Sequence, residues 1–252
     1  MICKNCEEEF NGNFCNNCGQ KSETKKINYS YLIDEISNNI LQVNRGIFFT
    51  IKELSIRPGH SIREFLNGKR KQHFKPIAFV LLTSALYVLV TFLLNEKTFL
   101  GSVFSGMVRA LTETGSEKSM TANILSWLSN NFNYSSLFLL PFFSLASYIS
   151  FRKEEYNFFE HLVLNCYLTG QQTLIYLIST IIISLLKVES YYFPAFTLLI
   201  TILFTFWTFN QFFYNRKIFS KTLLTFTSYV LYFLVIMLVI LTFGIIDGIF
   251  KR

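Results

Sequence analysis

The sequence predicts an all-α integral membrane protein, in which a bundle of about five transmembrane helices carries a small four-cysteine zinc-ribbon module at its N-terminus. Only 15% of the 252 residues are charged, whereas soluble domains carry about a quarter. Of the 39 charged residues, 20 lie in the first 75, and long apolar stretches follow them. The chain therefore divides into a zinc ribbon (1–24), amphipathic juxtamembrane helices (25–75) and a transmembrane domain (76–252).

The first element is the cysteine module. Each of its two cysteine pairs has a two-residue gap, and eight residues separate the pairs. This spacing lets both thiolates of a pair bind one ion, and two pairs complete an all-sulfur tetrahedral site that favours zinc. Gly19 allows a tight turn after the second pair, and we expect Phe10 and Phe14 to form a small apolar cap. The predicted zinc ligands are Cys3, Cys6, Cys15 and Cys18.

Two other uses of these cysteines compete with a metal site. Disulfides are disfavoured because the topology derived below puts the thiols in a reducing compartment. Redox chemistry is disfavoured because the sequence lacks a thioredoxin-like βαβ pattern. A structural zinc with four thiolates has no open position for a substrate, so we expect it to fold the module and not to catalyse. Cys166 lies in an apolar stretch, where we expect it to pack. Acidic and basic residues balance over residues 1–30, which argues against a nucleic-acid partner.

Residues 25–75 are expected to form two amphipathic helices beside the membrane, the first ending at Arg57-Pro58-Gly59 and the second at Gly68. Their apolar positions are Ile47, Phe48, Ile51 and Leu54, then Ile62, Phe65 and Leu66. A basic run follows, comprising Lys69, Arg70, Lys71 and Lys75. One interpretation is contact with lipid headgroups, where each basic residue contributes about 1 kcal/mol against anionic lipid. The simpler one, which we favour, is a determinant of membrane topology.

Five apolar runs in the transmembrane domain have 18 to 25 residues each, which is the length that a helix needs to cross a hydrocarbon core. The predicted spans are about 76–94, 134–151, 162–186, 191–213 and 222–246. With the N-terminus in the cytoplasm, the inside segments hold 17 Lys and Arg and the outside segments 6, so this orientation is predicted. The first 25 residues lack the apolar region of a signal peptide, so we expect the first span to direct insertion.

The segment 95–133 connects the first two predicted spans. Its apolar residues recur at helical spacing, which suggests two amphipathic helices on the outer leaflet with Trp127 at headgroup depth. A loosely ordered extracellular loop is an equally good interpretation.

Polar residues begin the third span, where Glu160 and His161 are followed by Asn165. His161 and Asn165 are four residues apart and share a helix face, and ionisable groups at membrane depth often mark ion or proton paths. The alternative, which we favour, places Glu160 and His161 in solvent at headgroup level, with Asn165 bonded to neighbouring helices.

Several stretches together resemble an uncharacterised bacterial family, domain of unknown function 3667. They are Cys3-x-x-Cys6 with Phe14-Cys15-x-x-Cys18-Gly19-Gln20-Lys21; Arg45-Gly46, Thr50-Ile51-Lys52-Glu53-Leu54 and Arg57-Pro58-Gly59; Ile62-Arg63-Glu64-Phe65 and Gly68-Lys69-Arg70-Lys71; and Tyr156-Asn157-Phe158-Phe159-Glu160-His161-Leu162. The resemblance implies a bacterial cytoplasmic (inner) membrane protein with a zinc ribbon. It also implies that residues 44–75 are more than a tether, and it implies no activity. Glu7 departs from the pattern because glycine often follows the second cysteine.

The sequence contains no recognised catalytic motif, so we expect a non-enzymatic adaptor whose cytoplasmic zinc ribbon binds a protein partner while the bundle sits in the lipid bilayer. The alternative is a small transporter or ion pathway that uses the polar face of the third span. Five spans without visible inverted repeats would then need to assemble as a homo-oligomer. An intramembrane enzyme acting on lipid would require a nucleophile or base that the sequence does not identify.

Overall fold

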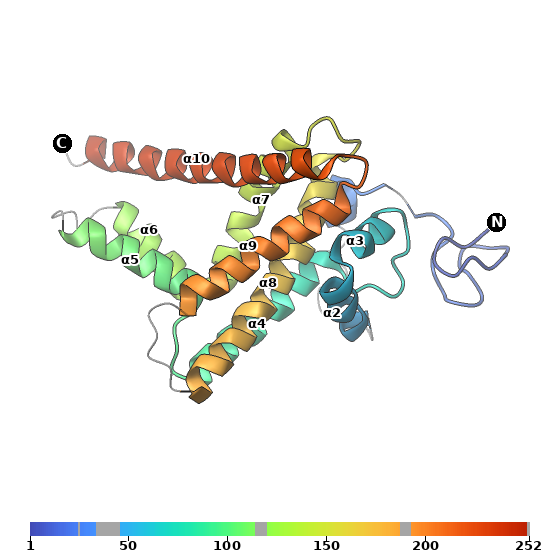
Figure 1. Cartoon of the computed structure of the whole chain (residues 1–252), viewed down its shortest axis with the longest axis horizontal. Helices are drawn as coiled ribbons and strands as arrows, with labels where there is room; N and C mark the ends of the chain where they lie inside the picture. The colour runs from blue at the N-terminus through green and yellow to red at the C-terminus, as the bar shows by residue number, and fades with distance from the viewer. Residues whose placement is uncertain (25, 34–45, 114–119, 187–192, 251–252) are drawn as a thin grey trace.

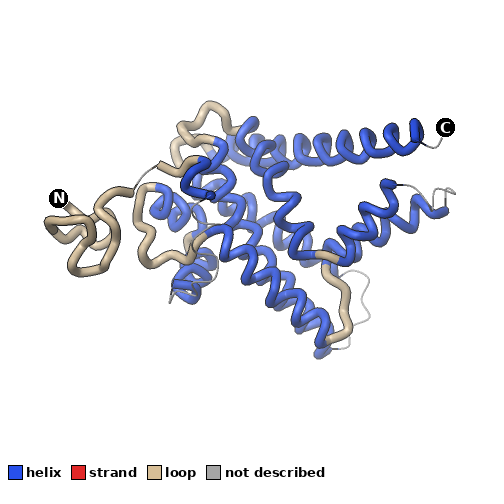
Figure 2. The backbone as a smooth tube through the Cα atoms, turned by 180° about the vertical axis from the view of Figure 1, so that it is seen from behind, coloured by secondary structure: helices blue, strands red, loops and turns tan. Residues whose placement is uncertain are grey.

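The computed structural model describes residues 1–24, 26–33, 46–113, 120–186 and 193–250, and within these ranges the chain is helical with no β-strand. The helices are α2 (Gly46–Ile56), α3 (Pro58–Leu66), α4 (Pro76–Leu93), α5 (Phe99–Glu113), α6 (Met120–Asn130), α7 (Phe132–Ser150), α8 (Phe158–Leu186), α9 (Phe193–Phe212) and α10 (Ile218–Phe250). The cysteine module and the C-terminal end of α10 lie at opposite ends of the molecule, as Figures 1 and 2 show. The predicted all-α architecture is confirmed.

Five of these helices, α4, α7, α8, α9 and α10, are long and apolar enough to cross a membrane, which confirms the predicted number of spans. The third begins earlier than its apolar run because Asn157 and Glu160 cap it. The Glu160 backbone N–H donates to Asn157 Oδ1 at 3.0 Å, and the Asn157 backbone N–H donates to Glu160 Oε2 at 2.8 Å. Such a reciprocal pair satisfies two backbone donors at a helix N-terminus and fixes where α8 starts.

The first and third spans, α4 and α8, run in the same direction and form the most extensive helix pair. Phe79 lies 6.0 Å from Tyr167 and Tyr87 lies 6.3 Å from Tyr176, ring centre to ring centre. Gly170 makes the close approach possible, because a Cβ there would overlap the Phe79 ring. Parallel first and third spans are what a chain that crosses the membrane at each span requires.

The segment between the first two spans is helical over Phe99–Glu113 and Met120–Asn130, so the loose-loop interpretation is wrong for these residues. The two helices pack through the buried side chains of Phe104, Leu125 and Leu128. In Figure 1 they lie below α10, which extends away from α4 and α8. Their position on the outer leaflet stays a prediction, and Trp127 is an exposed residue.

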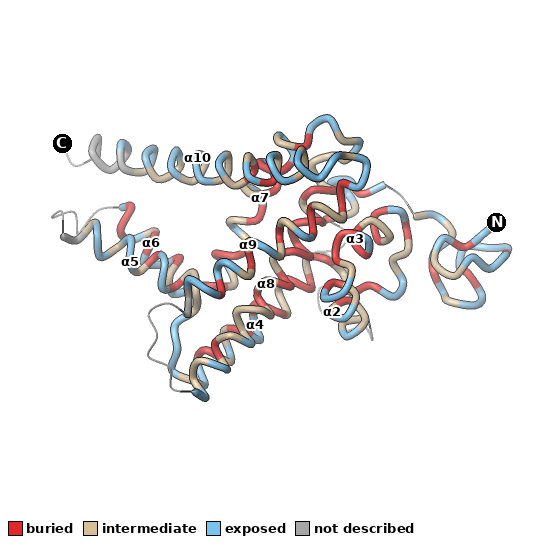
Figure 3. Tube along the Cα trace, viewed as in Figure 1, coloured by how far each residue is buried: buried red, intermediate tan, exposed pale blue. Residues whose placement is uncertain are grey.

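The helices α2 and α3 pack against one end of the bundle. Leu54, Ile62 and Phe65 are buried in the same core as Tyr167 of α8 and Phe209 of α9. In Figure 3, buried segments of α2, α3 and α8 lie close to one another. The predicted break between the two helices is confirmed, because Pro58 opens α3 in the position where a missing N–H has no cost.

Candidate functional site

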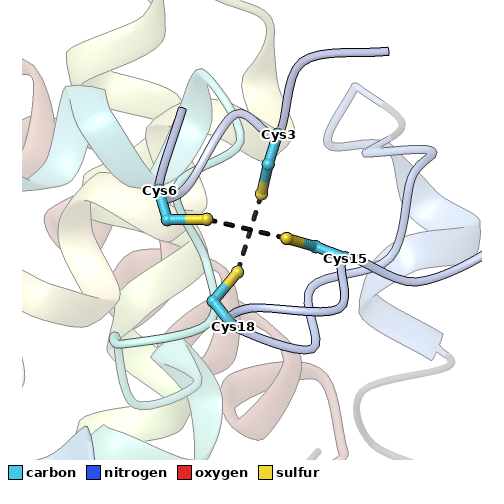
Figure 4. Close-up of side chains that lie close together, drawn as sticks. All are labelled: Cys3, Cys6, Cys15 and Cys18. Atoms are coloured by element: carbon cyan, nitrogen blue, oxygen red, sulfur yellow. Dashed lines mark hydrogen bonds between the residues drawn. The ribbon is translucent and has the colours of Figure 1, made fainter. Parts of the chain in front are cut away.

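The four N-terminal cysteines converge on one point. Their sulfur atoms all lie within 4.8 Å of one another, and the Cys3–Cys18 and Cys6–Cys15 sulfurs are each 3.6 Å apart, as the dashed lines in Figure 4 mark. In a tetrahedral zinc site with Zn–S bonds of about 2.3 Å, sulfurs lie about 3.8 Å apart. The donor set and its spacing therefore fit a metal ion with four thiolate ligands.

The thiols of Cys3 and Cys6 differ in pKa. Burial raises the pKa of the Cys3 thiol, but hydrogen bonds from backbone N–H groups of Cys6 and Asn5 oppose it and lower the pKa to about 7. The Glu8 backbone lowers the pKa of Cys6, but burial and the neighbouring sulfurs raise it to about 12. Four sulfurs this close cannot all carry negative charge unless a cation lies between them.

Two copies of one turn build the site. The Glu7 N–H donates to the Cys3 carbonyl at 2.9 Å, and twelve residues later the Gly19 N–H donates to the Cys15 carbonyl at 2.8 Å. Both turn residues are left-handed, with φ of +64° at Glu7 and +70° at Gly19. Glu7 thus makes the turn that glycine makes in the second copy, at a steric cost that glycine avoids.

We therefore expect Glu7→Gly to stabilise the metal-loaded module by about 1 kcal/mol, or about fivefold in metal affinity, because glycine adopts this φ without strain. Competition with a chromogenic chelator measures the affinity. The matched control is Glu8→Gly, which removes the same charge at a residue with ordinary φ and should weaken binding slightly. Equal affinities for the two variants would contradict the strain at residue 7.

The apolar cap of the module is smaller than predicted. Phe10 is buried beside the cysteines, but Phe14 is 54% exposed, so its predicted place in the cap is wrong. Phe14 forms an isolated antiparallel bridge with Lys21, and the two thus share an outward side of the module.

The module docks on the loop that follows α3. The buried Gln20 side chain accepts hydrogen bonds through Oε1 from the backbone N–H groups of Arg70 at 3.1 Å and Lys71 at 3.3 Å. Gly68, with φ of +110°, lies so close that a Cβ there would be 2.7 Å from Thr24 Oγ1 and 2.9 Å from Lys4 Cδ. The four-cysteine module is therefore fixed to the helix bundle through the loop that follows α3, which carries the basic residues Lys69, Arg70 and Lys71 and which we call the basic loop.

The four basic residues for which lipid contact is the alternative interpretation have different surroundings. The Arg70 guanidinium lies 4.8 Å from the Tyr31 ring centre and 5.5 Å from that of Phe65, and its Nε donates to the Phe65 carbonyl at 3.2 Å. Its charge is thus directed into the protein. Lys71 is exposed, whereas Lys69 and Lys75 are half-buried. Both interpretations, lipid contact by the lysines and the favoured determinant of topology, stay predictions.

The Arg-Pro-Gly motif anchors α3 to the end of α9. Gly59 approaches the α9 backbone so closely that a Cβ would overlap the backbone nitrogen of Phe212, and its N–H donates to Gln211 Oε1 at 3.2 Å. Arg63 donates to the backbone carbonyls of Gln211 and, at 2.8 Å, of Phe212. A cation bound to the last carbonyls of a helix also offsets the negative end of its dipole.

The first residue of the motif, Arg57, binds Glu53 of α2 at 2.6 Å and Glu64 of α3 at 3.1 Å. The hydrogen bonds that the Arg57 guanidinium donates to the Glu64 carboxylate raise the pKa of Arg57, as do the nearby negative charges, while burial opposes this shift. The loop after α3 packs against these helices, and His73 of this loop is hydrogen-bonded to Ser61 of α3 at 3.0 Å. Burial lowers the pKa of His73 and thus favours the neutral imidazole ring. A neutral ring can accept the hydrogen bond from the Ser61 hydroxyl through Nε2.

Of the three polar residues predicted at the start of the third span, the structure brings two together. His161 Nδ1 and Ser147 Oγ of α7 are 3.0 Å apart, and Asn165 Nδ2 donates to Ser147 Oγ at 3.0 Å. Glu160 instead caps α8 and lies 4.0 Å from Lys26. The favoured interpretation of a solvated Glu160 and His161 is wrong, because Glu160 is buried and His161 is 0% exposed. His161 Nε2 and Asn165 Oδ1 are buried without a hydrogen-bond partner.

Comparison with known sequences adds one finding. The pattern of a family described as "Protein of unknown function (DUF3667)" matches residues 44–88. No curated protein and no solved structure matches the chain. The matched range covers α2, α3, the basic loop and most of α4, including the Arg-Pro-Gly anchor. The chain therefore carries the DUF3667 pattern over residues 44–88, which confirms the resemblance inferred from its motifs.

Proposed function

We propose that the protein is a non-enzymatic membrane adaptor, in which a zinc-loaded cytoplasmic head binds a protein partner and five spans hold that head at the membrane. The single observation that carries the proposal is the closed set of four sulfurs within 4.8 Å of one another. A metal with four thiolate ligands has no position for a substrate, so such a site serves to shape a surface. Zinc is the ion that four thiolates at this spacing favour.

The surface of the module supports a protein partner. One side of the head is occupied by the chain's own basic loop through Gln20. Elsewhere the head exposes the large apolar side chains of Ile2 and Phe14. Apolar groups that are exposed on a rigid, metal-stabilised fold suit contact with another protein.

Charge and redox chemistry support a cytoplasmic location of the head. The 17 to 6 excess of Lys and Arg supports a cytoplasmic N-terminus, and free thiolates persist in a reducing cytoplasm. The ion-pathway alternative draws on the two unpartnered atoms of His161 and Asn165. Their complete burial among α7 and α8 side chains weighs against a continuous path.

In-cell cross-linking of the full-length protein tests the adaptor function. We expect Phe14→Glu to remove at least one cross-linked protein that the unmodified chain captures, because a charge would be introduced into the proposed contact. Retention of bound metal shows that the head remains folded. Tyr29→Glu is the control, since it places the same charge on an exposed aromatic residue outside the module. Identical cross-linked proteins for Phe14→Glu and the unmodified chain would count against the head as the docking element.

A further inference from the structure

One side of α2 presents apolar side chains away from the protein. Phe48 is 82% exposed and Ile56 is 59% exposed, with the exposed Lys52 between them. The three residues are spaced four apart, so they form one stripe along the helix, which we name the α2 stripe. The opposite side is buried through Thr50 and Leu54.

The depth of α2 along the bundle points to what covers this stripe. The Phe74 backbone N–H donates to Thr50 Oγ1 at 2.7 Å, which places the middle of α2 beside the start of α4. Gln171 of α8 donates to Ser55 Oγ at 2.8 Å. Because Gln171 comes nine residues after Leu162, where the apolar run begins, this contact lies about 13 Å along that run. The helix α2 therefore runs from beside the start of α4 to the depth of the apolar part of α8.

The charged side chains of Glu53, Arg57 and Glu64 are paired away from the α2 stripe, as a position beside an apolar layer requires. Glu53 is one residue after Lys52 and hence about 100° around the helix from it. Glu53 binds Arg57, which also binds Glu64, so these charges are paired with one another. The α2 stripe carries a single charge, the Lys52 ammonium at the end of a flexible apolar stem, which can reach a headgroup phosphate while the stem stays in an apolar layer.

We propose that the α2 stripe is a lipid-docking surface, with Phe48 inserted at the boundary between acyl chains and headgroups, Ile56 among the acyl chains and Lys52 extending to an anionic headgroup. Exposed apolar residues that flank a basic one are typical of helices lying in a membrane interface. The stripe lies within the segment that matches the family pattern. The matched segment therefore fixes the depth of the bundle in the leaflet, in addition to anchoring α3 to α9. The alternative occupant, a second copy of the chain, is an outcome of the test below.

Tryptophan fluorescence quenching in full-length protein tests the proposal. The native tryptophans are first replaced through Trp127→Phe and Trp207→Phe, and Phe48→Trp then provides the only tryptophan emission. The protein is reconstituted in vesicles of phosphatidylcholine and phosphatidylglycerol that carry bromine near the headgroup end of the acyl chains. We expect an emission loss of about twofold relative to unbrominated vesicles, because an interfacial side chain lies within contact of the bromine. Phe14→Trp in the same background is the exposed control, and its emission should be unchanged.

Ile56→Trp provides an independent probe on the same stripe if Phe48→Trp fails to fold, which loss of bound metal or a polydisperse elution profile would reveal. Quenching at position 56 supports the proposal in the same way as quenching at position 48. Emission from both positions that is quenched no more than at position 14 would overturn it. Unquenched emission that is shifted to short wavelength would also overturn it and assign the stripe to contact with a second copy.

Discussion

Replacing Cys15 with Ser is expected to empty the metal site and unfold the module. Cys15 is buried among the other three sulfurs, and a structural zinc contributes about 10–16 kcal/mol to the folding of such small modules. The bound metal should fall from one ion per chain to almost none. The Gln20 contact would be lost with the fold, so the amide hydrogens of Arg70 and Lys71 should exchange with solvent faster. Elemental analysis and hydrogen-exchange mass spectrometry measure the two effects.

Cys166→Ser is the matched control for this experiment. Cys166 is a buried cysteine of α8 that packs with Val80 and Leu140, far from the module. This variant should retain one metal ion per chain and normal exchange at Arg70 and Lys71. Stoichiometric metal in the Cys15→Ser protein would contradict the four-sulfur site. Unchanged exchange at the loop, with the metal lost, would contradict the Gln20 contact as the link to the bundle.

Replacing Gly59 with Ala is expected to force α3 away from α9. The new Cβ would lie 2.5 Å from Gln211 Cβ and 2.6 Å from the Thr208 carbonyl oxygen, and it would overlap the Phe212 backbone nitrogen. Backbone atoms of a packed helix cannot move aside cheaply, so we expect a loss of about 3 kcal/mol in the free energy of unfolding. Thermal unfolding in detergent measures the loss, and faster exchange of the α3 amides would locate it.

Gly106→Ala tests whether glycine replacement itself causes the effect. Nothing lies within 4 Å of a Cβ at Gly106 in α5, so this variant should be unchanged or more stable by up to about 1 kcal/mol, since alanine favours a helix. If both variants lose a similar amount of unfolding free energy, the close contact between α3 and α9 is not the reason why position 59 needs glycine.

The predictable parts of this protein rest on local sequence. The five spans follow from the length and apolarity of each run, and the convergence of the four sulfurs follows from the spacing within each cysteine pair. The Asn157–Glu160 cap was predictable in the same way, because a capping residue and a glutamate three positions later are a recognised helix start.

What could not be predicted depends on contacts between distant segments. Gln20 and Arg70 are 50 residues apart, and Gly59 and Gln211 are 152 apart, so no local pattern identifies these partners. The burial of His161 has the same origin. The position of His161 at the edge of its apolar run suggested solvent, but Ser147 of α7 reaches it from another helix.

The most direct test of the account is the metal and thiol content of the full-length protein, purified in detergent without added metal. We predict one zinc ion per chain and no disulfide, with the four module thiols protected from alkylation until the zinc is removed. Metal well below one ion per chain, together with disulfides among Cys3, Cys6, Cys15 and Cys18, would contradict a zinc-folded head in a reducing compartment.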